Sequence, residues 1–108
     1  MPTRVYIQPP TSEFPSKMRV EEQYELKERK KLTVDTTGTS YTTTTTNPAL
    51  AIIIVDGDDV QLDTSTISDD SPVIKDGGSL SITLGRKQTT FYAKAVNTSA
   101  NVYILIFG

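Results

Sequence analysis

Apolar and polar residues alternate with a period of two along most of this chain, which predicts β-strands. The clearest case is the segment 79–85, where every second residue is apolar and the others are Ser, Thr or Gly, as in a strand with one buried face. Val60 and Leu62 have the same spacing and are predicted to point into the core. The segment 49–55 is apolar at every position and predicts a buried strand, which a tight turn at 56–57 closes.

The chain ends in a strand pattern that is apolar on both faces. One face carries Val102, Ile104 and Ile106, and the other carries Tyr103, Leu105 and Phe107. A strand of this kind must be covered on both sides. Either it is a central strand beneath another layer, or its second face meets a neighbouring subunit, with Tyr103, Leu105 and Phe107 as candidate interface residues. Together with a strand over 89–96 and a turn at 97–100, it is expected to form a C-terminal hairpin.

Residues 17–34 are rich in Glu, Lys, Arg and Leu, a composition typical of helices, but their apolar positions have strand spacing. Apolar side chains occupy even positions only, at Met18, Val20, Tyr24, Leu26, Leu32 and Val34. Even positions lie on one face of a strand. We therefore expect one long strand, or two strands broken near 28–31, with the interleaved Glu and Lys on a solvated face. A short charged helix over 19–31 is the alternative.

Residues 1–16 contain four of the six prolines and predict an extended N-terminal arm. Proline lacks the backbone N–H and fixes φ, so this stretch forms neither a central strand nor a helix. The arm also carries apolar side chains that a purely disordered tail seldom needs, namely Val5, Tyr6, Ile7 and Phe14. We expect these four residues to form an interface on another subunit; local packing of the terminus is the alternative.

The fold class that follows is all-β, an antiparallel β-sandwich or small barrel of about seven to nine strands. A length of 108 residues allows one β-domain, over 17–108, besides the arm. The Thr-rich run 42–46 is predicted to be a strand with hydroxyls on both faces, and 64–72 a surface loop. Ser and Thr number 26 of the 108 residues, which suits a modest core and a hydroxyl-rich surface.

Composition argues against an enzyme and against several classes of partner. His, Cys and Trp are absent, which removes imidazole and thiolate catalysis and zinc sites built from these ligands. No catalytic residue and no cofactor is therefore expected. A net charge of -2 provides no basic field for nucleic acid, and the longest apolar run, seven residues at 49–55, is too short for a membrane helix. The first residues lack the apolar core of a secretory signal, so synthesis in the cytoplasm is expected.

Two groups of residues are candidates for ligand chemistry. Four acidic side chains, Asp56, Asp58, Asp59 and Asp63, offer oxygens of the kind that calcium prefers. The EF-hand pattern is absent and Asp beside Gly is typical of turns, so no metal site is expected here, although calcium binding stays an alternative. Tyr92 and Tyr103 are predicted to lie near each other on adjacent strands, where aromatic rings can stack on sugars; a position at the edge of the core or at an interface is the favoured explanation.

Residues 32–108 resemble small β-sandwich virion proteins of tailed bacteriophages, including capsid decoration (cement) and head-associated proteins. The similar features are the Thr-rich opening over 32–62, the "IKDGGSLSITLG" turn and strand, and the closing "TTFYAKAVNTSANVYILIFG". The resemblance implies a non-enzymatic structural protein of the virion. Its partners would be further copies of itself, in a homo-oligomer such as a trimer, and the major capsid or neck protein. The alternative is a receptor- or carbohydrate-binding module of a tail fibre or tail tip, using Tyr92, Tyr103 and the loop 64–72.

Overall fold

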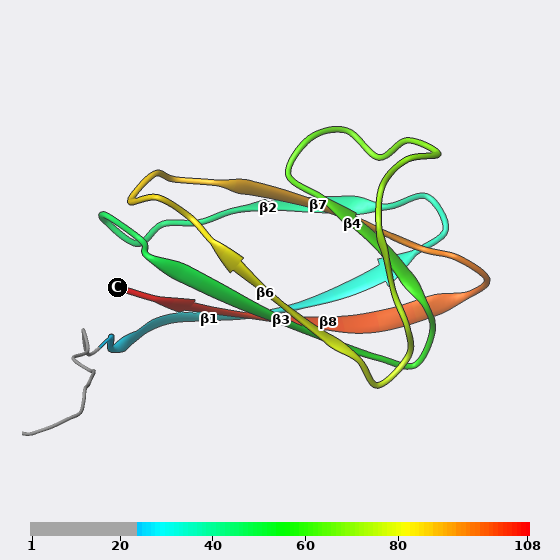
Figure 1. Ribbon diagram of the computed structural model, residues 1–108. Coiled ribbons are helices and arrows are strands. Elements are labelled where there is room, and N and C mark those ends of the chain that lie inside the picture. Colours follow the sequence, from blue (N-terminus) through cyan, green and yellow to red (C-terminus); the bar gives the residue numbers. More distant parts are fainter. Residues whose placement is uncertain (1–23) are drawn as a thin grey trace, which may run out of the picture.

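The structure, a computed structural model, describes residues 24–108 and consists of two four-stranded antiparallel sheets packed face to face (Figure 1). The strands are β1 (Leu26–Asp35), β2 (Thr39–Thr42), β3 (Leu50–Asp56), β4 (Val60–Asp63), β5 (Val73–Ile74), β6 (Ser79–Thr83), β7 (Thr90–Ala95) and β8 (Ser99–Phe107). The predicted all-β sandwich is confirmed. The predicted arm over 1–16, with its apolar residues Val5, Tyr6, Ile7 and Phe14, lies outside the described residues. The described part of the chain contains no helix that could cross a membrane.

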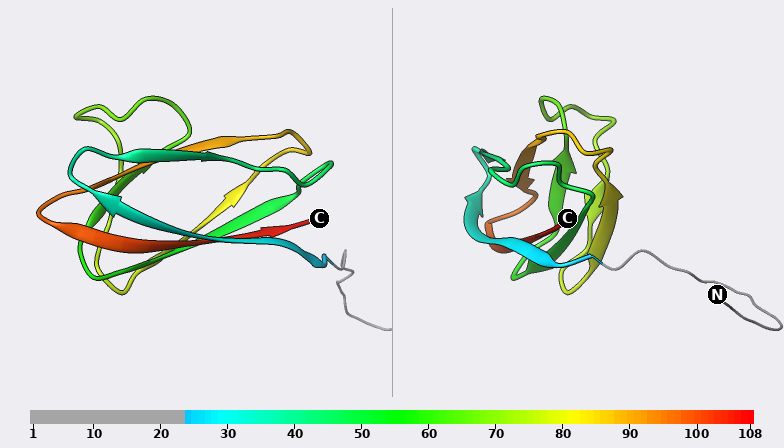
Figure 2. Two further views of the ribbon diagram at one scale, coloured as in Figure 1. Left: turned by 180° about the vertical axis from the view of Figure 1, so that it is seen from behind. Right: turned by 90° about the vertical axis from the view of Figure 1, so that its left-hand side faces the viewer.

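Except for β4 and β5, consecutive strands lie in different sheets. One sheet has the order β1-β8-β3-β6 and the other has the order β2-β7-β4-β5; we call them the β8 sheet and the β7 sheet. Figure 2 shows the two layers from behind and from one end. Of the described strands, only β4 and β5 are neighbours both in sequence and in a sheet. Eight strands in this order form a jelly roll, a β-sandwich built from two Greek keys.

The core lies between the sheets and is built from every second residue of the long strands. It contains Leu32, Val34, Ala51, Ile53, Val55, Val60, Leu62, Ile74, Leu84, Phe91, Ala93, Ala95, Ala100, Val102, Ile104 and Ile106. The inward orientation predicted for Val60 and Leu62 is confirmed. On β6, Leu80 and Ile82 are only partly buried and pack against the core from its margin.

The predicted C-terminal hairpin is wrong, because β7 and β8 belong to different sheets. Residues 96–98 cross from one sheet to the other, and Asp58 in the β3–β4 connection holds them there. Its Oδ2 atom accepts hydrogen bonds from the backbone N–H groups of Asn97 (2.9 Å) and Thr98 (2.8 Å). The predicted turn at Asp56-Gly57 is present, with Gly57 at a φ of 107° that favours glycine, but it too connects the two sheets.

β1 is one continuous strand, so the alternative of a helix is wrong for residues 24–31, while 17–23 lie outside the described residues. A β-bulge between Leu26 and Glu28 interrupts the alternation of side chains. Leu26 therefore pairs with Phe107 on the outer side of the sheet and is 42% exposed, instead of facing the core with Leu32 as predicted.

The Thr-rich run 42–46 is mostly a loop, not the predicted strand, since β2 ends at Thr42. The cause is the Glu28 side chain of β1. Its carboxylate accepts hydrogen bonds from the backbone N–H groups of Thr44 (3.0 Å) and Thr45 (3.0 Å). Because these N–H groups donate to the Glu28 carboxylate, they cannot also form the backbone hydrogen bonds of a strand.

Candidate interface and candidate binding groove

The outer side of the β8 sheet is apolar over three adjacent strands. Tyr103, Leu105 and Phe107 point away from the core on β8, because the residues between them are buried. Their partners on β3 are also apolar. We call the whole group the outer apolar face, and it consists of Leu26, Leu50, Ile52, Ile54, Tyr103, Leu105 and Phe107. Three of the predicted interface residues are therefore brought together with four others that the sequence did not single out.

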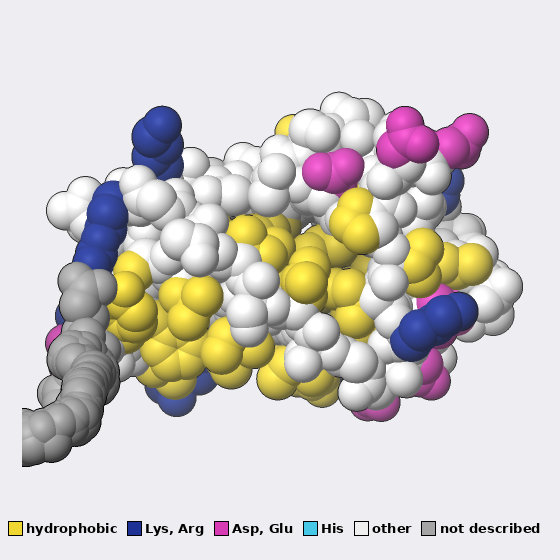
Figure 3. All heavy atoms as spheres, viewed as in Figure 1, with side chains coloured by type: hydrophobic (Ala, Val, Ile, Leu, Met, Phe, Trp, Pro, Cys, Tyr) yellow, Lys and Arg dark blue, Asp and Glu magenta, His cyan; other side chains and the backbone are white. Residues whose placement is uncertain are grey.

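β8 is a central strand whose inner face is covered by the β7 sheet. No segment among the described residues crosses its outer side (Figure 2). Figure 3 shows hydrophobic side chains along β3 down to the lower margin of the molecule, where the outer side of this sheet begins. Ile54, in the row of Tyr103, is 37% exposed. The strand was expected to be covered on both faces. Among the described residues, the β7 sheet covers the inner face, and no segment covers the outer face.

Polar side chains frame the outer apolar face on both edges. On β1, Lys31 pairs with Tyr103, and its ammonium group lies 5.9 Å from the centre of the tyrosine ring. Arg29 lies beside Leu105 in the next row. On β6, Ser81 lies beside Ile52. An apolar centre with a polar margin is the usual composition of a protein–protein contact surface.

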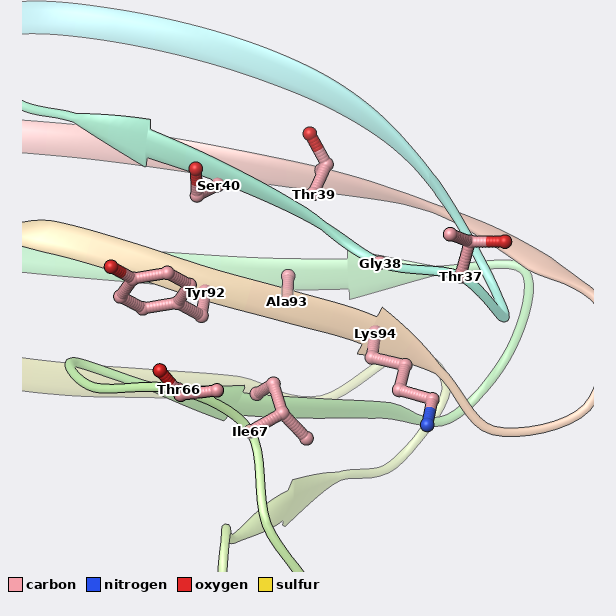
Figure 4. Close-up of a pocket in the computed structure, with 9 residues that line it drawn as sticks. All are labelled: Thr37, Gly38, Thr39, Ser40, Thr66, Ile67, Tyr92, Ala93 and Lys94. Carbon is pink, nitrogen blue, oxygen red and sulfur yellow. The ribbon is translucent and has the colours of Figure 1, made fainter.

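The outer side of the β7 sheet is mostly polar. Its outward residues on β2, β4 and β7 are Ser40, Thr42, Gln61, Asp63, Thr90, Tyr92 and Lys94, and β5 adds the exposed Val73. A shallow groove of about 470 Å³ runs over this side (Figure 4). It is lined by Thr37, Gly38, Thr39, Ser40, Thr66, Ile67, Tyr92, Ala93 and Lys94.

The groove contains two of the three elements named for the carbohydrate-binding alternative, Tyr92 and the loop 64–72. Tyr103 lies on the opposite side of the sandwich, so the prediction that Tyr92 and Tyr103 are neighbours is wrong. The reason is that β7 and β8 do not pair. Sequence reasoning missed Lys94, although its position two residues after Tyr92 on a strand places both on one face.

Hydrogen bonds attach the loop 64–72 to the outer side of β4. Gln61 donates from Nε2 to the carbonyl oxygen of Ser68 (3.2 Å). The hydroxyl of Ser71 donates to Oδ2 of Asp63 (2.8 Å) and accepts from the N–H of Ser68 (2.9 Å). The Ser71 hydroxyl is the main reason why the pKa of Asp63 lies below its ordinary value. The wall of the groove is therefore held in place.

Of the four Asp residues weighed for calcium, Asp58, Asp59 and Asp63 each accept hydrogen bonds from different partners. In the described part of the chain, no three acidic side chains are grouped so that they could hold a metal ion. Asp58 accepts hydrogen bonds chiefly from the backbone of Thr98 and Asn97, which lowers its pKa from 3.8 to about 2. Asp59 accepts from the N–H of Asp76 (3.0 Å).

Glu28 joins the two sheets at the edge where β1 meets β2, a role that sequence reasoning missed. Besides its bonds to Thr44 and Thr45, it accepts a hydrogen bond from the hydroxyl of Tyr41. Burial by itself raises the pKa of Glu28, but the hydrogen bonds from Tyr41, Thr45 and Thr44 outweigh it and lower that pKa. Burial and the same contact raise the pKa of Tyr41. The sequence did contain a sign of this role: Glu28 occupies an even position, like the core residue Leu32, and so lies on the same face of the strand.

No protein family, no curated protein and no solved structure matches this chain. The class that the geometry defines is an all-β jelly roll with one apolar and one polar outer side. The resemblance to virion proteins of tailed bacteriophages stays a prediction from the sequence.

Proposed function

We propose that this protein is a non-enzymatic structural protein of a virion, a capsid decoration (cement) or head-associated protein. It acts as a homo-oligomer, and a second copy of the chain covers the outer apolar face. The observation that carries this proposal is the composition of that face: seven apolar residues in adjacent rows of one sheet, with no described segment over them. Contiguous apolar surface of this kind is uncommon on a monomer and is typical of contact sites.

Charge favours one arrangement of the two copies. The β1 margin carries Arg29 and Lys31, whereas the β6 margin carries Ser79 and Ser81. If the faces pack about a two-fold axis parallel to the strands, the cationic margin of one copy lies over the hydroxyl margin of the other. Like charges then stay apart, and the contact is the same on both copies.

The size of the face indicates that other residues contribute. A stable interface buries roughly 800 Å² on each partner, more than seven half-buried side chains provide. The residues proposed to supply the rest are the apolar side chains of the segment 1–16, Val5, Tyr6, Ile7 and Phe14. That segment would also reach the neighbouring capsid or neck protein.

The virion assignment is supported by the resemblance of residues 32–108 and by the jelly-roll order of the strands. Jelly rolls build many viral capsids, but they also occur in lectins and in other proteins. A fold alone does not define a function. The assembly surface is therefore the stronger part of the proposal, and the two parts need separate tests.

Sedimentation velocity of the full chain over a range of concentrations tests the assembly surface. We expect an oligomer that Ile52→Asp weakens, because the charge would be buried at the centre of the contact. Thr42→Asp is the matched control, since Thr42 is exposed on the outer side of the other sheet, and it should leave the oligomer unchanged. Deletion of residues 1–16 should weaken association and leave the β-sheet circular dichroism intact.

A monomer at every concentration, or equal association of the two Asp variants, would contradict the assembly surface. The virion part is tested by co-sedimentation of the oligomer with empty capsid shells. We expect binding that Ile52→Asp or the deletion reduces, and failure of the unaltered oligomer to bind shells contradicts this part alone.

A further inference from the structure

Tyr92 differs from the other tyrosines in the described part of the chain. The other three each contact a charged side chain: Tyr24 with Arg86, Tyr41 with Glu28 and Lys30, and Tyr103 with Lys31. Tyr92 lies opposite Asp63 of β4, but its hydroxyl forms no hydrogen bond with any described residue and no cation lies over its ring. It nevertheless lines a groove and is only partly exposed. Its ring and its hydroxyl are both available to a ligand.

Lys94 is the one charged residue among the described residues that line this groove. It forms no ion pair with a described residue. Its cross-strand neighbour on β4 is the neutral Gln61, and the nearby Asp63 accepts hydrogen bonds from Ser71, Thr64 and Ser65. The ammonium group of Lys94 is therefore the cation that the groove presents.

Tyr92 and the amino group of Lys94 lie toward opposite ends of the groove, as Figure 4 shows. β2 forms one side, with the hydroxyl of Ser40, and the loop forms the other, with Thr66 and Ile67. Residues i and i+2 of a strand are separated by roughly 7 Å. The groove thus offers an aromatic ring, then hydroxyl donors and acceptors, then a positive charge.

We infer that this groove binds a short acidic oligosaccharide. One sugar ring packs on Tyr92, whose ring is apolar and whose hydroxyl can bond the sugar. Sugar hydroxyls exchange hydrogen bonds with Ser40 and Thr66, and a carboxylate on the neighbouring sugar pairs with Lys94. The site is on the sheet opposite to the outer apolar face, so the inference does not depend on the assembly role.

An acidic peptide fits the groove less well. An extended peptide binds a sandwich through backbone hydrogen bonds to the edge of a sheet. Here the groove lies over the face of β7, which pairs with β2 on one side and with β4 on the other. Its polar groups are side-chain hydroxyls and one ammonium group, which suit a ligand rich in hydroxyls and carrying a carboxylate.

Amide chemical shifts of the ¹⁵N-labelled full chain test the inference, with a hyaluronan tetrasaccharide and with 3′-sialyllactose as the probes. We expect at least one of them to shift the signals of residues 37–40, 66–67 and 92–94. Tyr92→Ala should weaken binding by about tenfold and Lys94→Gln by roughly fivefold. Tyr92→Phe should retain most of the affinity, because the ring remains. Lys87→Gln, an exposed lysine outside the groove, is the matched control and should bind as the unaltered chain does.

Two further probes define what would overturn the inference. Chitotetraose is a neutral oligosaccharide, and equal binding of it would refute the role of Lys94. Tetraglutamate is an acidic peptide, and preferential binding of it would refute the saccharide. Absence of shifts in the groove with both acidic saccharides would overturn the inference altogether, and the oligomeric state of the same samples shows whether the assembly role stands independently.

Discussion

The outer side of the β8 sheet presents seven apolar residues, whereas the outer side of the β7 sheet presents hydroxyls, an amide, a carboxylate, a lysine and one exposed valine. The inner sides of the two sheets show no such difference, because buried apolar residues line both. Folding of a two-layer sandwich requires only the inner sides to be apolar. The comparison therefore separates residues that build the domain from residues that are available for contacts.

The largest effect on folding is expected on β8, where a core residue and a residue of the outer apolar face are neighbours in the chain. Ile104 is fully buried, so Ile104→Asp places a charge in the core and should cost more than about 4 kcal/mol of folding free energy. Because domains of this size have about 5–15 kcal/mol of stability in total, we expect this variant to be largely unfolded by circular dichroism. Leu105→Asp, on the outer apolar face, should stay folded and should lose association instead.

The contrast fails if the two variants behave alike. If both variants are unfolded, the outer apolar face is needed for folding. If both stay folded and oligomeric, Ile104 is not buried in the core and Leu105 is not buried between subunits. Leu105→Asn, which carries no charge, is the milder variant and should weaken association less than Leu105→Asp.

A smaller effect on folding, with none on association, is expected at Glu28. Glu28→Ala leaves the donors of Tyr41, Thr44 and Thr45 without their acceptor. The loss should lower the free energy of unfolding in urea by about 1–3 kcal/mol. Glu25→Ala is the control, since the Glu25 side chain is 80% exposed and its pairing with Lys27 should contribute little. An unchanged unfolding midpoint in Glu28→Ala would contradict the proposed joint between the sheets.

The smallest effect is expected on the dependence of stability on pH in the acid range. The pKa of Asp58 is lowered from 3.8 to about 2 in the folded protein, so its carboxylate stabilises the fold above a pH of about 4. This contribution is lost as the pH falls from about 4 toward 2, where the folded form also becomes protonated. Asp58→Asn should flatten the dependence of the unfolding temperature on pH in that window. Asp69→Asn, at an exposed site in the β4–β5 loop, should keep the dependence of the unaltered chain.

Local periodicity predicted much of the domain, since it depends on which side of a strand a residue faces. The inward positions of Val60 and Leu62 and the two apolar faces of the last strand followed from alternation alone. Alternation also favoured a strand over a helix for residues 26–35 in spite of their helical composition. The β-bulge after Leu26 could not be predicted in this way, because one inserted residue reverses the faces without changing the composition.

Strand pairing was not predictable from the same pattern. β7 and β8 are separated by a short turn that would suit a hairpin, yet they lie in opposite sheets. The segment that crosses between them is held by Asp58, which is 39 residues away from Asn97 in the sequence. The misassigned run 42–46 has a similar cause, because its N–H groups are taken by Glu28 from another strand.

The amino-acid sequence by itself determined the all-β class, the turn at Asp56-Gly57 and the apolar character of both faces of β8, since these depend on residue type and on neighbours in the chain. Only the tertiary structure decided which segments share a surface: Tyr103 with Ile54, and the Tyr92 and Lys94 face of β7 with the loop 64–72. The physical reason is that a strand pattern records the side to which each residue points, while the neighbours on that side are chosen by long-range hydrogen bonds and by packing between the sheets.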